Sequence, residues 1–192
     1  MLHEYWMLVP DEDFVERLVP EMFSILQWFL DRLQPYENDD DASDDENDPL
    51  LLLGPLEWWN FIDWVPGWEA GVPPGANHQD GGSAIVSLQF VYTLHKAVKL
   101  LDAFGFAQRA TRYRDLADTI ATSVYTTCWH SERQLLADTP DQTSFSQHAN
   151  VLGILTGSIP QRDWQSVMKR ILQGAPDMAD RKSTRLNSSH LA

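Results

Sequence analysis

A run of twelve residues, Trp58 to Glu69, with the sequence WWNFIDWVPGWE, holds four of the eight tryptophans of the chain and two carboxylates. Indole rings can lie against the C–H face of a pyranose, while carboxylates and amides hydrogen-bond its hydroxyls. Pro66 and Gly67 interrupt any helix here, and loops lie at the surface. The run therefore indicates a sugar-binding loop, although each tryptophan taken singly is more often a core residue.

Two long segments of this polar and aromatic kind alternate with stretches of helical periodicity. The first segment covers residues 54–82 and the second covers residues 129–144. Such lengths exceed those of ordinary connections, and long ordered loops inside a domain are commonly functional. Any site built by this chain is therefore expected on the loops.

The apolar periodicity predicts the helices that position these loops. We expect a short amphipathic piece at the start, then a helix capped near Asp11 that ends near Gln34. Ser83 caps the next helix, Gly105 ends it, and a partner helix follows over residues 107–128. The last expected helices cover residues 147–155, after a cap at Ser144 or Ser146, and residues 161–172.

The order of these elements predicts an all-α fold. Tight turns join the helices in antiparallel pairs, and no strand pattern appears. Short turns at one end and long loops at the other are typical of a toroid of helical hairpins. Periodicity alone leaves an irregular helical bundle open.

Composition places the chain among globular proteins, as one domain or part of one. Its 192 residues are 43% hydrophobic and carry a net charge of −14, to which residues 37–48 contribute eight acidic side chains. We expect this acidic stretch to be a disordered loop, since it cannot bury apolar area. An EF-hand is not predicted, because its central glycine and closing glutamate are missing.

The same totals exclude several kinds of partner. No basic stripe can neutralise phosphates, so we expect no nucleic acid, and no apolar run is long enough for a membrane span. The single cysteine, Cys128, forms no internal disulfide and is expected to be a buried apolar residue. The histidines show no metal spacing. The compartment stays open, with a preference for the cytoplasm, and the oligomeric state stays open too.

Both ends of the chain look unlike natural ends. The start, MLHEYWML, is already amphipathic, so Met1 reads as an internal methionine of a longer frame. Residues 180–192, DRKSTRLNSSHLA, look like a translated sequencing adapter and are left out of the fold prediction. We therefore expect residues 1–179 to be an internal piece of a larger protein.

Four motifs resemble the (α/α)6 catalytic domain of bacterial α-L-rhamnosidases, glycoside hydrolase family 78. They are MLHEYWMLVPDEDFVERLVP, WNFIDWVPGWEAGVPPG, CWHSERQLLADTP and FSQHANVLGILTG, in family order over residues 1–179. The tryptophan motif is specific, whereas the helix patterns between the motifs are not. The resemblance implies a partial (α/α)6 toroid.

The resemblance also implies a reaction: hydrolysis of terminal α-L-rhamnosyl groups with inversion, without a metal or another cofactor. Inversion uses a carboxylic acid and a carboxylate base about 6.5 to 9.5 Å apart. In the family these lie upstream of the region that matches Met1 and downstream of the region that matches Ala179. The chain is therefore expected to bind a rhamnose-containing glycoside but to lack the catalytic pair.

The resemblance assigns substrate-binding roles residue by residue. Asp63 resembles a ligand of the rhamnose hydroxyls and Trp64 a wall of the pocket, although an aspartate in a loop can instead cap backbone N–H groups. The resemblance implies further substrate contacts, each of which could instead be a rim, core or structural residue. These are Trp68, Glu69, Trp59, Trp129 and His148.

Two other classes of function stay open. One is a non-catalytic carbohydrate-binding helical scaffold, and the other is a different glycosidase or lyase on the same toroid, because a fold does not determine its chemistry. A truncated toroid is also expected to expose apolar surface and to be poorly soluble.

Overall fold

The fold is all-α, with two small pairs of strands beside the helices. The computed structural model describes residues 1–9, 11–35, 50–57, 60–76 and 82–173. The elements in these ranges are α1 (Leu2–Leu8), α2 (Glu12–Arg17), α3 (Val19–Leu30), β1 (Leu33–Pro35), β2 (Leu51–Leu53), α4 (Ala84–Ala103), α5 (Ala107–Cys128), β3 (Trp129–His130), β4 (Leu135–Leu136), α6 (Gln147–Thr156), a 3-10 turn (Gln161–Asp163) and α7 (Trp164–Gln173). The predicted acidic loop at 37–48 and the tail at 180–192 lie outside the described residues.

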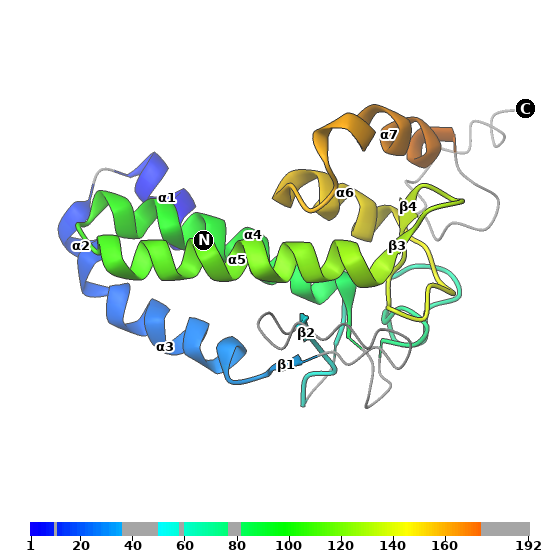
Figure 1. Cartoon of the computed structure of the whole chain (residues 1–192). Helices are drawn as coiled ribbons and strands as arrows, with labels where there is room; N and C mark the ends of the chain where they lie inside the picture. The colour runs from blue at the N-terminus through cyan, green and yellow to red at the C-terminus, as the bar shows by residue number, and fades with distance from the viewer. Residues whose placement is uncertain (10, 36–49, 58–59, 77–81, 174–192) are drawn as a thin grey trace, which may run out of the picture.

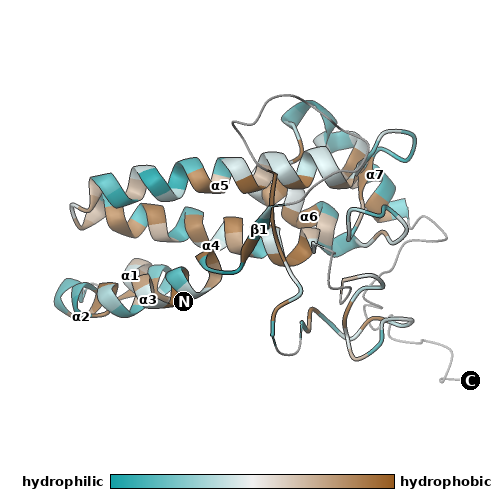
Figure 2. Ribbon diagram, turned by 60° about the horizontal axis from the view of Figure 1, so that its bottom comes forward, coloured by the Kyte–Doolittle hydropathy of each residue, from teal (hydrophilic) through white to brown (hydrophobic). Residues whose placement is uncertain are grey.

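A hairpin of two long helices, α4 and α5, forms the centre of the molecule (Figure 1). Helix α4 begins after Ser83, whose side chain accepts a hydrogen bond from the Val86 N–H. Gly105, at φ +80°, makes the tight turn into α5, whose bounds agree with those predicted. The α4 ribbon is mostly apolar in Figure 2, whereas hydrophilic segments recur along α5. The core therefore surrounds α4.

Shorter helices lie at both ends of this hairpin, and two of them, α1 and α6, pack directly on α4. In Figure 1, α1 and α2 lie at one end of the α4–α5 pair, and α6 and α7 lie at the other. Helix α6 begins at the predicted cap Ser146, and Gly157, at φ +79°, ends it. Tight turns and long loops thus alternate as expected, while closure into a six-hairpin toroid stays a prediction.

The expectation of a strand-free chain was wrong. Strands β1 and β2 pair antiparallel, as do β3 and β4. The single helix predicted between Asp11 and Gln34 was also wrong: it is divided into α2 and α3, and α3 ends at Leu30 because the chain turns into β1 there. Side chains of the central hairpin hold β2: the Ser123 hydroxyl accepts from the Leu51 N–H and the Ser87 hydroxyl from the Leu53 N–H, each at 2.9 Å. Such pairing between distant residues has no local signature.

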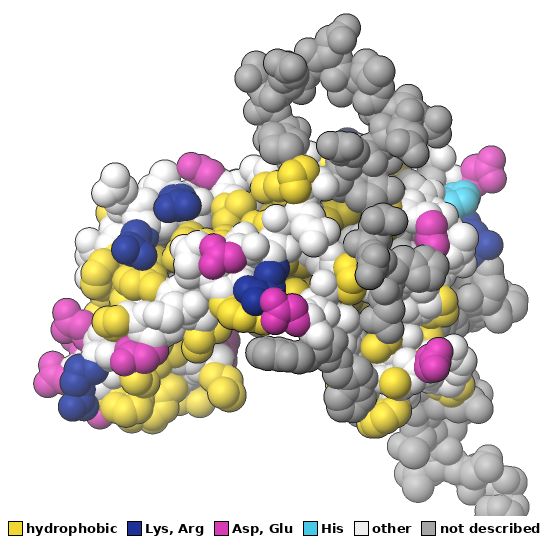
Figure 3. Space-filling model, turned by 90° about the horizontal axis from the view of Figure 1, so that it is seen from below, with side chains coloured by type: hydrophobic (Ala, Val, Ile, Leu, Met, Phe, Trp, Pro, Cys, Tyr) yellow, Lys and Arg dark blue, Asp and Glu magenta, His cyan; other side chains and the backbone are white. Residues whose placement is uncertain are grey.

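Large apolar side chains lie on the surface at several places. They include Leu8 on α1, Ile25 on α3, Leu155 on α6 and Leu172 on α7, each at least 60% exposed. Viewed from below, apolar side chains cover much of the end of the molecule that carries α1 to α3 (Figure 3). These side chains agree with the exposed apolar surface that the sequence predicts, while low solubility stays a prediction.

Candidate functional site

The aromatic loop, defined as residues 60–76, has a fixed backbone although it contains little regular structure. The Gly71 carbonyl accepts hydrogen bonds from the N–H groups of Ile62 and Asp63, at 2.9 and 3.3 Å. Gly71 has φ +75°, and a Cβ atom there would lie 2.5 Å from two ring carbons of Phe61. Only glycine suits this position. The two sides of the loop are thereby closed on each other beside Asp63.

Trp68 anchors the loop in the core. Its side chain is 8% exposed and belongs to the same apolar cluster as residues of α4 and α5. The imidazole of His148, in the first turn of α6, lies against the indole, with ring centroids 5.4 Å apart. Trp68 therefore packs against the His148 ring and has little exposed surface left for contact with a sugar.

Asp63 and His148 meet across this loop. The His148 Nε2 lies 3.2 Å from the Asp63 Oδ2, although the two residues are 85 positions apart in the chain. The other oxygen, Oδ1, accepts a hydrogen bond from the Trp64 N–H at 2.8 Å. Both side chains are about one fifth exposed. This carboxylate is thus held at both oxygens and still reaches solvent.

Asp63 and His148 both line a surface depression of about 370 Å³. Its walls come from the aromatic loop, from α4 and from the first two turns of α6, and the lining residues are Asp63, Gln89, Gln147, His148, Val151 and Leu152. A carboxylate, two amides and an imidazole beside two aliphatic side chains can hydrogen-bond several hydroxyls and receive a C–H face. Of the lining residues, Asp63 is the one carboxylate.

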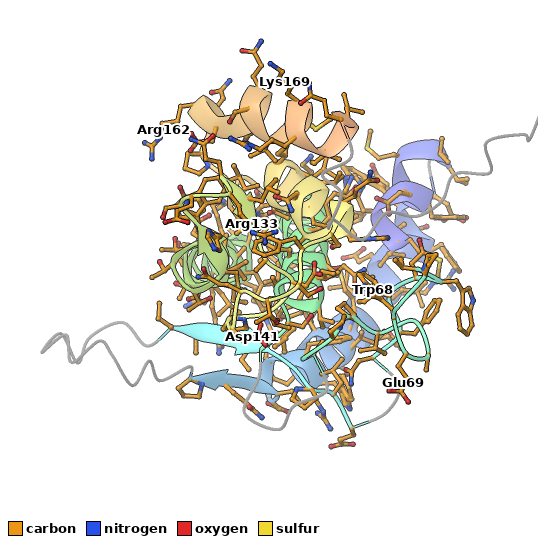
Figure 4. The ribbon with its side chains drawn as sticks, turned by 90° about the vertical axis from the view of Figure 1, so that its right-hand side faces the viewer. Trp68, Glu69, Arg133, Asp141, Arg162 and Lys169 are labelled. Carbon is orange, nitrogen blue, oxygen red and sulfur yellow. The ribbon has the colours of Figure 1, made fainter. Side chains whose placement is uncertain are left out.

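The other predicted contacts lie around this depression or away from it. Trp64 is 68% exposed and lies against the ring of Phe61, with centroids 5.2 Å apart, so it presents an aromatic surface to solvent next to Asp63. Glu69 is exposed at the lower rim of the loop, below Trp68 in Figure 4. Trp129 stacks on Tyr125, one turn back on α5, and does not line the depression. The predicted contact Trp59 lies outside the described residues.

Sequence reasoning missed the support of the α6 N-terminus. Asp138 is fully buried and accepts hydrogen bonds from the hydroxyls of Ser144 and Ser146. Burial raises the pKa of its carboxyl group, and the two serine hydrogen bonds oppose that shift. An aspartate followed within nine residues by two serines and the start of a helix is the signal that was available. It identifies a capping network but not its place under the site.

Neither Cys128 nor any group of metal ligands forms a second centre in the part of the chain that the structure describes. Cys128 is the last residue of α5, and burial raises the pKa of its thiol to about 12, which agrees with the predicted apolar role. Among the described residues, no three histidine, cysteine or acidic side chains come close enough to hold a metal ion. Within the same ranges, no helix has the length and apolarity needed to cross a membrane.

Comparison with known proteins identifies the fold. No family model matches the sequence, and no curated protein matches it. Among solved structures, the chain is similar to the GH78 family rhamnosidase of Bacillus sp. GL1, with a TM-score of 0.69 and 20% identity over 93% of this chain and 17% of that one. It is also similar to the rhamnosidase from Klebsiella oxytoca with rhamnose bound, with a TM-score of 0.66 and 15% identity over 92% of this chain and 29% of that one.

The two comparisons agree with each other and with the motifs. The chain spans less than a third of either rhamnosidase, and within that span nearly all of it superimposes. At these identities the likeness establishes the fold and not the reaction. The chain therefore has the fold of one part of the rhamnosidases, including a member of glycoside hydrolase family 78, the group that its motifs resemble.

Proposed function

We propose that this chain is part of a glycosidase that removes terminal α-L-rhamnosyl groups, and that it supplies sugar-binding side chains. The observation that carries the proposal is the depression in which the Asp63 carboxylate meets the His148 imidazole beside the exposed indole of Trp64. Motifs of the family fall on these same residues. The solved structures that share the fold are rhamnosidases.

Each side chain has a specific role in this proposal. The fixed Asp63 carboxylate accepts hydrogen bonds from adjacent sugar hydroxyls, and Trp64 covers one face of the ring. His148 and the neighbouring Gln147 contribute further polar contacts from α6. Glu69, Trp59 and Trp129 are proposed as contacts of the wider cleft, while Trp68 acts through His148.

Inverting hydrolysis needs a second carboxyl group about 6.5 to 9.5 Å from the first. The lining of the depression contains one carboxylate, Asp63, and we assign it to binding and not to catalysis. The acid and the base of the parent enzyme are proposed to lie on its other segments. The chain by itself is therefore expected to bind rhamnose without hydrolysing a rhamnoside.

A titration of the chain with L-rhamnose, followed by calorimetry or NMR, tests the proposal. Loss of a hydrogen bond to a charged group costs about 1.5–3 kcal/mol, so Asp63→Ala should weaken binding by roughly 10-fold to 100-fold. The matched control is Asp115→Ala, at an exposed aspartate on α5 outside the depression. Equal affinities of the two variants contradict the assignment of Asp63.

A non-catalytic carbohydrate-binding scaffold is the second candidate, favoured by the same single carboxylate in the lining. The genomic DNA on both sides of the coding region separates the two. A rhamnosidase predicts an acidic motif upstream and a glutamate-bearing loop downstream. Ligand binding by the chain without either motif in the genome favours the scaffold.

A further inference from the structure

The first turns of α4 and α6 meet at one buried residue, Asp138, which contacts α4 through its backbone and the Ser146 cap of α6 through its side chain. Its carbonyl oxygen accepts from the N–H of Ala84, the first residue of α4, at 3.0 Å, and its own N–H donates to the Ser144 carbonyl at 2.8 Å. Its carboxylate accepts the hydroxyls of Ser144 and Ser146. Asp138 therefore ties the beginning of α4 to the beginning of α6.

The contact with Ser146 orients the start of α6. The Ser146 hydroxyl donates a hydrogen bond to the Asp138 carboxylate, and its oxygen accepts a hydrogen bond from the Ala149 N–H at 3.2 Å. An N-cap used in this way fixes the direction of the first helical turn. His148, in that turn, reaches the Asp63 carboxylate at 3.2 Å. Two hydrogen bonds and one helical turn thus connect Asp138 with the Asp63–His148 pair.

A second contact leaves α6 little freedom to slide. Asn150 accepts from the Leu136 N–H and donates to the Leu136 carbonyl, both at 2.9 Å, and it also donates to the Ser146 carbonyl at 2.8 Å. Asn150 thereby holds the body of the turn on β4, while Asp138 sets its end.

A carboxyl group whose two oxygens both accept suits this task better than an amide. A buried charge is costly unless it is hydrogen-bonded, and Asp138 has no exposed surface. Both serine hydroxyls donate to it, Ser146 to Oδ1 and Ser144 to Oδ2. The lone pairs of Ser146 are then left to cap the helix. An amide in the same place would offer a donor to one of these hydroxyls and weaken the cap.

We propose that Asp138 is a positioning residue of the sugar site, which holds the first turn of α6 so that the His148 imidazole stays on the Asp63 carboxylate. The role in sugar binding rests on the proposed function. The role in holding His148 does not, because the contact between His148 and Asp63 exists without a ligand. The two can therefore be tested separately.

The test compares Asp138→Asn with wild type in two measurements, made well below the melting temperature of each protein. NMR of the imidazole nitrogens reports the contact of His148 Nε2, with Asp63→Asn as the reference for its loss and His148→Gln for assignment. Titration with L-rhamnose reports the affinity. Asp115→Asn, on the exposed face of α5, is the matched control for loss of a charge.

We expect Asp138→Asn to move the His148 signals toward those of Asp63→Asn. It should also lower the rhamnose affinity by roughly 10-fold, the loss expected when one hydrogen bond to a charged group is weakened. The control should match wild type in both measurements. If the Asp138→Asn variant has a lower melting temperature but keeps the wild-type His148 signals and rhamnose affinity, the role of Asp138 is purely structural and the proposal is overturned.

A second pair of variants keeps the proposal falsifiable if Asp138→Asn does not fold. Ser146→Ala removes the hydroxyl that links Asp138 to α6, and Ser146→Thr restores a hydroxyl at the same position. The alanine variant should lose the His148 signature and the threonine variant should regain it. If both variants keep the wild-type His148 signals, the positioning role is refuted. If wild type binds no rhamnose, the proposed function fails, and the His148 signals alone decide the role of Asp138.

Discussion

Substitution of Gly71 by alanine tests whether the closed backbone of the aromatic loop holds the site. Gly71 has φ +75°, a conformation that costs an L-residue about 1–2 kcal/mol. The new Cβ would also lie 2.5 Å from two carbons of the Phe61 ring and 3.0 Å from the Asp63 carbonyl oxygen. Displacing packed neighbours typically costs about 1–3 kcal/mol. Together we expect Gly71→Ala to destabilise the chain by about 2–5 kcal/mol.

Two other glycines isolate the steric part of this cost. Gly67 and Gly105 also have positive φ, at +90° and +80°, but nothing lies within 4 Å of a Cβ built on either. Their alanine variants should therefore lose only about 1–2 kcal/mol. Gly67 lies in the same loop as Gly71, whereas Gly105 lies in the α4–α5 turn, remote from the depression.

Urea unfolding of the three variants measures the free energies of unfolding, and a rhamnose titration measures the site. Trp68 couples the loop to the core, so its deformation should appear in global unfolding. Gly71→Ala should be the least stable variant. It should also bind rhamnose most weakly, because the Gly71 carbonyl accepts the hydrogen bonds from the Ile62 and Asp63 N–H groups that hold Asp63 in place. Gly105→Ala should bind like wild type. Equal stability and affinity of Gly71→Ala and Gly67→Ala would refute the reasoning.

Three further predictions concern the supporting structure. Asn150→Ala should cost at least about 2 kcal/mol in urea unfolding, because it leaves the N–H and carbonyl of Leu136 without these partners in a buried place; a loss below 0.5 kcal/mol, as an order of magnitude, would contradict this. Gly153→Ala should cost about 1–3 kcal/mol, since its Cβ would lie 2.6 Å from Leu136 and 2.8 Å from Ile159, and an unchanged melting temperature would show that the core adapts. The buried Cys128 thiol should resist alkylation by iodoacetamide at pH 8 in the folded chain and should react in urea, which mass spectrometry can follow. The pKa of this thiol is about 12 in the folded chain, above its ordinary value of 9.0. The stability that the buried neutral thiol contributes is therefore complete below pH 9 and is lost as the pH rises toward 12.

The helices of the centre were predictable because their ends carry local signals. Ser83 and Ser146 cap their helices through their own side chains, and Gly105 and Gly157 adopt positive φ at the helix ends. Each signal lies within a few residues of the boundary that it sets. The bounds of α5 agree with the prediction for this reason.

The strands and the site pair were not predictable in the same way. Pairing of β1 with β2 joins residues on either side of an intervening stretch, and Asp63 meets His148 across 85 positions. Local propensity contains no information about such contacts. The sequence likewise could not distinguish Trp64, which is 68% exposed, from Trp68, which is 8% exposed, since both stand in one loop without periodicity.

A crystal structure of this chain grown with L-rhamnose tests the central proposal most directly. We predict one rhamnose in the depression, with hydroxyl oxygens within about 3.2 Å of the Asp63 carboxylate. One face of the sugar should lie against Trp64, and the contact between His148 and Asp63 should be retained. An empty depression at saturating sugar, or rhamnose bound elsewhere on the chain, would contradict the account.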